Sequence, residues 1–258
     1  MNKYFLGVGI NEYPFNELKN CVKDVVDFKK KICNRIADEN TILLLDKNAN
    51  KQAIKTSLYA MVSCMTGDDI AILYLSGHGI KTIYDKKLCE AFVPFDAIDE
   101  NGDIDPDKFM IDLEFNHIFK KIPKEGMLLM IGDYCHSGDS HKKFNLIPKS
   151  VTLPEIQVMI NEIIAKTSNS ELRHRTIEEA PVVLISACQP DETAMDSLVL
   201  KNGVLTYYLI ESILSYPLPV RPTIRQIFND TTIKIKNNHF YQNPGLYGVG
   251  ELFDKSFC

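Results

Sequence analysis

The chain has 258 residues, a mass of 29.3 kDa and a formal net charge of −5. This length can bury one sizeable core, and the 45% hydrophobic and 24% charged residues exclude the disordered and fibrous classes. The acidic balance gives no reason to expect a nucleic-acid partner, which usually needs a basic surface. We expect one domain over residues 1–258.

Strands and helices are predicted to alternate along the first part of the chain. Apolar residues recur every three to four positions in the helical segments and form short continuous runs in the strands. The predicted strands are residues 4–10, 41–45 and 69–78, and the predicted helices are residues 18–36 and 50–65. This alternation is typical of a parallel sheet with right-handed crossover connections.

The second part continues the pattern with two irregular regions. Residues 80–110 lack clear periodicity, and residues 139–180 have the composition of an exposed linker. The predicted strands are residues 127–133 and 181–187, and the predicted helices are residues 113–122, 203–214 and 223–235. We therefore expect an α/β fold, a three-layer sandwich with a central, mostly parallel six-stranded sheet flanked by helices.

The cysteines and the apolar segments indicate the cellular compartment in which the protein works. Seven scattered cysteines, odd in number and mostly within apolar segments, favour reduced thiols over a disulfide framework. The chain opens directly on strand-like residues, and no apolar run approaches the ~18 residues that span a bilayer. We expect a cytoplasmic protein without a membrane partner.

Two of the predicted strands end in residues that can perform chemistry. One strand ends at His78, followed by Gly79, and another delivers Cys135. A thiol becomes a good nucleophile when a nearby imidazole takes its proton. The N–H groups of Gly79 and Cys135 could then stabilise a developing oxyanion. The spacing also fits the roughly 50 residues that separate histidine from cysteine in caspases.

Several motifs resemble those of one family. Residues 76–79 (Ser-Gly-His-Gly) and 133–138 (Asp-Tyr-Cys-His-Ser-Gly) resemble the two signatures of metacaspases and bacterial caspase-like cysteine peptidases, which have a caspase–haemoglobinase fold. Residues 18–24 are similar to the early Gly-Cys-x-x-Asp segment of the family, with Asn20 in place of glycine. Residues 186–196 and 202–208 resemble segments of the small subunit. The resemblance implies a Cys-His endopeptidase with His78 and Cys135 as catalytic residues.

The resemblance also implies a preference for arginine or lysine before the cleaved bond. The family positions that hold this cation match Asp24 and Asp133, and a further pocket position matches Ser76. Asp133 lies two residues before Cys135, so in an extended segment both side chains share one face. Two carboxylates in a partly buried pocket favour a cation.

The linker offers candidate sites of self-cleavage in a zymogen. Residues 1–138 correspond to a large subunit and residues 181–258 to a small subunit, with 139–180 between them. Basic residues that a basic-specific enzyme could cut there are Lys142, Lys143, Lys149, Lys166, Arg173 and Arg175. We favour Arg173 or Arg175, because their neighbours are polar.

The sequence also limits the expected cofactors, partners and alternative functions. Calcium-dependent relatives have two adjacent aspartates in an acidic segment, and this chain has Asp112 and Leu113 at the matching positions. We therefore expect that no cofactor is required and predict no metal site. Dependence on calcium stays open. Expected partners are a protein or peptide substrate and an activating protein or ligand, and a monomer is expected. Family resemblance associates such peptidases with stress, cell death or defence. Two alternatives stay open: a catalytically silent interaction module, and a more distant clan member of the separase or gingipain type.

Overall fold

The computed structural model describes residues 1–14, 16–34, 36–84, 87–135, 145–151, 180–189 and 192–256. Its centre is a six-stranded sheet with the strand order β12-β9-β7-β3-β1-β2. The five strands from β9 to β2 pair in parallel, and only β12 at the edge runs antiparallel. The predicted α/β fold with a mostly parallel six-stranded sheet is therefore confirmed.

The elements follow the predicted alternation. The strands are β1 (Lys3–Gly9), β2 (Thr41–Leu45), β3 (Ile70–Ser76), β4 (Gly79–Tyr84), β5 (Lys87–Phe92), β6 (Met110–Ile111), β7 (Met127–Asp133), β8 (Leu146–Pro148), β9 (Val182–Ser186), β10 (Met195–Ser197), β11 (Asn202–Gly203) and β12 (Gly245–Gly248). The helices are α1 (Cys21–Lys31), α2 (Lys51–Cys64), α3 (Asp112–Phe119), α6 (Val204–Leu214) and α7 (Ile224–Asn237). Short 3-10 turns cover residues 38–40, 46–48, 95–97, 106–108 and 250–254.

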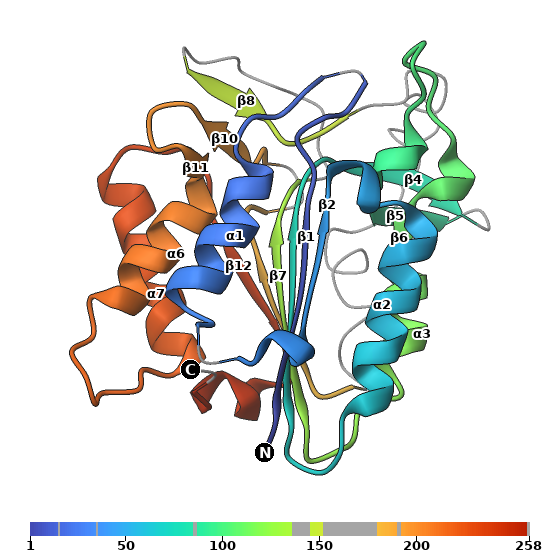
Figure 1. Ribbon diagram of the computed structural model, residues 1–258. Helices are drawn as coiled ribbons and strands as arrows, with labels where there is room; N and C mark the ends of the chain where they lie inside the picture. The colour runs from blue at the N-terminus through green and yellow to red at the C-terminus, as the bar shows by residue number, and fades with distance from the viewer. Residues whose placement is uncertain are drawn as a thin grey trace.

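Helices cover both faces of the central sheet, giving three layers. In Figure 1, α1, α6 and α7 lie on one side of the strands, and α2 and α3 lie on the other. Successive residues of a strand point to opposite faces, so Phe5 of β1 joins the apolar cluster with Phe28 of α1, while Leu6 joins the cluster with Leu58 of α2. The central strands β1, β3 and β7 are thus buried on both faces over most or all of their length, which explains their continuous apolar runs.

Side-chain caps fix two helix starts close to the predicted positions. The side chain of Asn50 accepts a hydrogen bond from the Ala53 N–H at the start of α2. Thr223 and Gln226 form a reciprocal capping box at the start of α7. Helix α1 is shorter than the predicted 18–36, because the chain enters it only at Cys21 and leaves it at Lys31.

Two regions differ from the sequence-based expectation. Residues 79–92 contain a hairpin, in which β4 pairs antiparallel with β5, although neither strand has an alternating apolar pattern. Residues 145–151, within the region expected to be an exposed linker, instead contain β8, which pairs with β10. Lys149 directly after β8 is fully buried. The expectation of exposure was wrong for this segment, because ion pairs compensate the burial of its charge.

The register of the central strands places the chemistry at one edge. Strands β3 and β7 are neighbours, with Ser76 opposite Asp133. The chain leaves β3 toward His78 and leaves β7 toward Cys135 at the same carboxyl edge of the sheet, where ligands gather in α/β folds. The backbone of Gly79 lies against that of Cys135 at this edge, and the pairing of the His78 ring with the Cys135 thiol stays a prediction.

Candidate active site

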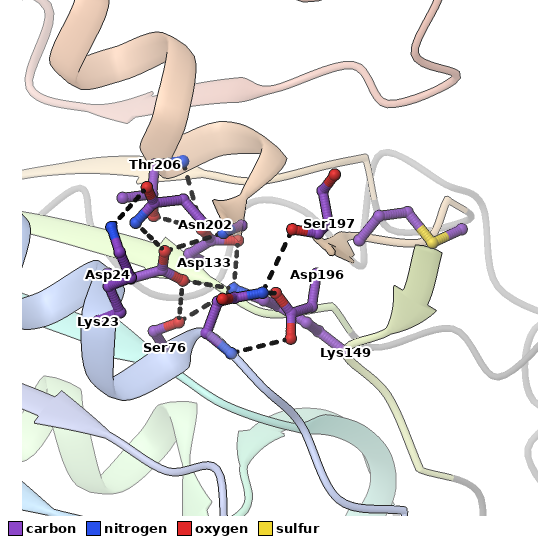
Figure 2. Close-up of polar contacts among 12 residues, drawn as sticks. Lys23, Asp24, Ser76, Asp133, Lys149, Asp196, Ser197, Asn202 and Thr206 are labelled. Carbon is purple, nitrogen blue, oxygen red and sulfur yellow. Dashed lines mark hydrogen bonds and ion pairs between the residues drawn. The ribbon is translucent and has the colours of Figure 1, made fainter. Parts of the chain in front are cut away.

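A buried lysine lies in the pocket that the sequence assigns to a substrate cation. Figure 2 shows the side chain of Lys149 reaching Asp24, Ser76 and Asp133. Its Nζ lies 2.9 Å from Oδ2 of Asp24, 3.0 Å from Oγ of Ser76 and 3.2 Å from Oδ1 of Asp133. Lys149, Asp24 and Asp133 are each 0% exposed. An ammonium has three N–H donors, and three oxygens surround it here.

The C-terminal part of the chain completes the pocket. Oδ1 of Asp24 accepts hydrogen bonds from the Asn202 side chain at 2.9 Å and from the Gly203 N–H at 2.8 Å. Oδ2 of Asp133 accepts hydrogen bonds from the N–H and hydroxyl of Thr206 (Figure 2). These donors fix both carboxylates and leave one oxygen of each turned toward the lysine.

Burial and charge oppose each other in this pocket. Burial raises the pKa of Asp24 to about 6, the Asp133 carboxylate also raises it, and the Lys149 ammonium lowers it. For Lys149, burial acts to lower the pKa, but the Asp133 and Asp24 charges outweigh it and leave the pKa well above its usual range. The lysine is therefore charged, and its charge holds the two carboxylates together.

The carbonyl of Lys149 lies between two backbone donors. Its oxygen accepts a hydrogen bond from the Gly79 N–H at 3.1 Å and from the Cys135 N–H at 3.3 Å. These are the two N–H groups that the sequence nominates for an oxyanion hole. Gly79 must lack a side chain, because a Cβ there would overlap the carbonyl of Cys135. The Lys149 carbonyl therefore lies beside the residues that follow β3 and β7.

The imidazole of His78 is fully buried and oriented by the loop that follows β1. Its Nε2 lies 2.5 Å from the Asn16 carbonyl, so the neutral ring donates from Nε2 and keeps a lone pair on Nδ1. The Tyr13 ring packs on the imidazole, and the Tyr13 hydroxyl accepts a hydrogen bond from the His78 backbone N–H at 3.1 Å. Burial lowers the pKa of His78 to about 4, with a smaller contribution from the Lys149 charge. The ring is therefore a neutral base at physiological pH.

The model of the caspase domain family matches residues 3–251, nearly the whole chain. The chain belongs to the caspase domain family. It is therefore a caspase-family peptidase domain, and the metacaspase-like recognition from its motifs is confirmed.

Known relatives agree with this assignment. The chain is 29% identical to Metacaspase-9 of Arabidopsis thaliana over 77% of its own length and 58% of the relative, and 28% identical to Metacaspase-4 of the same plant over 54% of its length and 34% of the relative. It thus spans less than two thirds of these relatives. The crystal structure of protein GSU0716 from Geobacter sulfurreducens matches 99% of this chain and 98% of that one, with a TM-score of 0.72 and 18% identity, which supports the fold.

A second thiol contacts the cysteine of this caspase domain. Strand β9 runs parallel to β7, and Cys188 follows β9 as Cys135 follows β7. A hydrogen bond with Cys135, together with burial, raises the pKa of Cys188 well above its usual range. Cys188 therefore stays protonated, and its S–H donates to the Glu192 carbonyl at 3.5 Å.

The structure brings together five sequence candidates and leaves others undescribed. Asp24, Ser76, His78, Asp133 and Cys135 lie around the Lys149 segment. The favoured cleavage positions Arg173 and Arg175 lie outside the described residues. The sequence names Lys149 among the basic residues of the linker but does not place it in the cation pocket. It does not indicate roles for Asn202, Thr206, Tyr13 and Asn16.

Metal binding and membrane insertion find no support among the residues that the structure describes. Calcium takes six to eight oxygen ligands, and the described ranges hold no group of three or more His, Cys, Asp or Glu side chains placed to share a metal. Asp112, the carboxylate kept from the calcium-dependent relatives, is half-buried, and burial raises its pKa to about 6. No described helix is long and apolar enough to cross a membrane.

Replacing Gly203 by alanine should expel Lys149 from the pocket, because a Cβ there would overlap both Nζ of Lys149 and Oδ2 of Asp133. The readout is acetylation of lysines in the Cys135→Ala background, followed by peptide mass spectrometry. In the parent, Lys149 should react at least about tenfold more slowly than the exposed Lys124, because breaking a buried ion pair costs more than the ~1.4 kcal/mol that a factor of ten represents. In Gly203→Ala the two should react at similar rates.

The matched control is Gly250→Ala, where an added Cβ meets nothing within 4 Å. It should leave Lys149 protected. Equal protection of Lys149 in the Gly203→Ala and parent proteins would contradict the geometry of the pocket.

Proposed function

We propose that this chain is a cysteine endopeptidase that cleaves after lysine or arginine, and that its first substrate is its own Lys149–Ser150 bond. The observation that carries the proposal is the position of Lys149. Its ammonium pairs with Asp24 and Asp133, while its carbonyl oxygen faces the N–H groups of Gly79 and Cys135. One residue therefore makes the side-chain and the backbone contacts of a substrate at once.

The proposed chemistry uses the two residues at the strand ends. His78 takes the thiol proton of Cys135, and the sulfur attacks the carbonyl carbon of Lys149. The negative charge that develops on the carbonyl oxygen is stabilised by the N–H groups of Gly79 and Cys135. His78 then returns the proton to the amine of Ser150 as the C–N bond breaks, and water hydrolyses the thioester at Cys135. The Asn16 carbonyl holds the ring through Nε2, which leaves Nδ1 for the proton.

The uncut chain blocks its own site. Lys149 fills the cation pocket, so another peptide can enter only after the Lys149 segment leaves. Cutting after Lys149 removes the covalent link that keeps this lysine at an effectively very high local concentration. We therefore propose that the uncut chain is the zymogen and that this cleavage opens the pocket to other substrates.

Purified wild-type protein should release a fragment that begins at Ser150, and Cys135→Ala should not, because the thiolate is the nucleophile. Lys149→Gln should also stay intact, since it removes the ammonium that the two carboxylates bind. The exposed Lys124→Gln is the matched control and should cleave like wild type. Intact mass and N-terminal sequencing measure the product.

The half-time of this cleavage should not change on hundredfold dilution, because the bond is already held within the same chain. Cleavage at Arg173 or Arg175 with an intact Lys149–Ser150 bond would contradict the proposal. An uncut chain that also leaves all added peptides intact would favour the silent module.

Processed enzyme should cleave lysine peptides about tenfold faster than the matching arginine peptides, the size of effect expected when a buried hydrogen-bonding group is left unmatched. The pocket is too small for a guanidinium, which is larger than an ammonium. The backbone of Gly203 already lies so close to Nζ of Lys149 that a Cβ on Gly203 would overlap this atom. Initial rates with paired peptides measure kcat/KM. Asp133→Asn should lower both rates, and a clear arginine preference would contradict the pocket geometry.

The kcat/KM for lysine peptides should have an acid limb with a midpoint near pH 6. Burial, the largest effect, and the Asp133 carboxylate raise the pKa of Asp24, which is about 6 in the uncut chain with Lys149 in the pocket. Binding of a cation needs ionised Asp24, so activity is complete above this pKa and falls about tenfold per pH unit below it. Asp24→Asn should be slower and lose this limb. If the variant kept the limb, His78 would be its source.

A further inference from the structure

The segment around Lys149 is paired with the enzyme on its N-terminal side. Strand β8 runs antiparallel to β10, with Leu146 opposite Ser197 and Pro148 opposite Met195. The pairing continues past the strand, since the Lys149 N–H donates to the Ala194 carbonyl at 3.0 Å. Residues leading to the scissile bond thus lie as an added strand, a common way to bind an extended peptide.

The segment is also paired on the C-terminal side of the bond. Ser150 forms a parallel bridge with Gly79, and the Val151 N–H donates to the Gly79 carbonyl at 3.1 Å. Gly79 therefore donates to the residue before the bond and accepts from the second residue after it. A peptide that ended at Lys149 would lose this second contact.

Alternate side chains of the segment face the protein. In an extended chain residues 147, 149 and 151 share one face. Val151 is 4% exposed and belongs to the apolar cluster that contains Ile80, Phe92 and Tyr134, while Ile147 packs against that cluster. Ser150, on the opposite face, is half-buried. The side chains on the inward face are therefore an aliphatic residue at 147, the lysine at 149 and an aliphatic residue at 151. The proposed cleavage follows the lysine.

We infer that the enzyme selects substrates on both sides of the cleaved bond, through an apolar subsite for the second residue after it and a shallower one for the second residue before the lysine. The inference rests on the proposed function and specifies its substrates: extended peptides with an aliphatic residue two positions before and two positions after the lysine. The segment from Leu146 to Val151 is then both the first substrate and the template for later ones.

The test uses processed enzyme and internally quenched peptides that contain Leu-Ile-Pro-Lys-Ser-Val, with one position changed at a time. Replacing the valine by aspartate should lower kcat/KM about 10- to 100-fold, since one apolar side chain in a pocket is worth about that much discrimination. The same change at the isoleucine should have a smaller effect. Replacing the half-buried serine by asparagine is the control and should change kcat/KM by less than about threefold, because in an extended chain its side chain lies on the face opposite to the lysine and the valine.

The same comparison within the chain removes any dependence on the added peptide. Val151→Asp should slow self-cleavage, while the exposed Lys124→Gln should not, and the thermal unfolding of both in the Cys135→Ala background checks the fold. If all peptides are cut after lysine at equal rates, the subsite inference is wrong and the peptidase proposal stands. If neither the parent peptide nor the chain is cut, the peptidase proposal fails and this inference fails with it.

Discussion

One ammonium between two carboxylates, all three groups shielded from water, is the interaction on which the site depends. Two buried carboxylates repel each other, and without a cation one of them would be protonated or hydrated. Lys149 supplies that cation from within the chain. Removing one partner of such a buried pair lowers the stability of the folded protein by about 3–5 kcal/mol. The buried ion pairs therefore hold Lys149 in place in the uncut chain. That stability also keeps the Lys149 carbonyl beside the N–H groups of Gly79 and Cys135.

Distant parts of the chain must meet for this arrangement to form. Helix α1 provides Asp24, the ends of β3 and β7 provide Ser76 and Asp133, and the segment at the start of α6 provides Gly203 and Thr206. The pairing of β3 with β7 in register sets the spacing of the first pair. A buried Asp196 links the N-terminal segment to β10, because it accepts hydrogen bonds from the backbone N–H groups of Lys19 and Asn20.

Much of this arrangement could be predicted because it depends on strands. Buried apolar runs locate β3 and β7, and the period of a strand then places Asp133 and Cys135 on one face. The hairpin of β4 and β5 could not be found this way, since Lys81 and Glu90 interrupt its apolar pattern. The pocket position of Lys149 and the roles of Asn16 and Tyr13 could not be predicted, because they depend on the path of loops. A lysine in a polar linker normally stays in water, and only the three-dimensional pairing with Asp24 and Asp133 makes its burial favourable.

The most direct test of the central claim is a crystal structure of the intact Cys135→Ala protein. The account predicts electron density for the Lys149 side chain between Asp24 and Asp133, with its carbonyl oxygen within hydrogen-bond distance of the Gly79 N–H. A structure in which Lys149 points into solvent and water fills the pocket would contradict it.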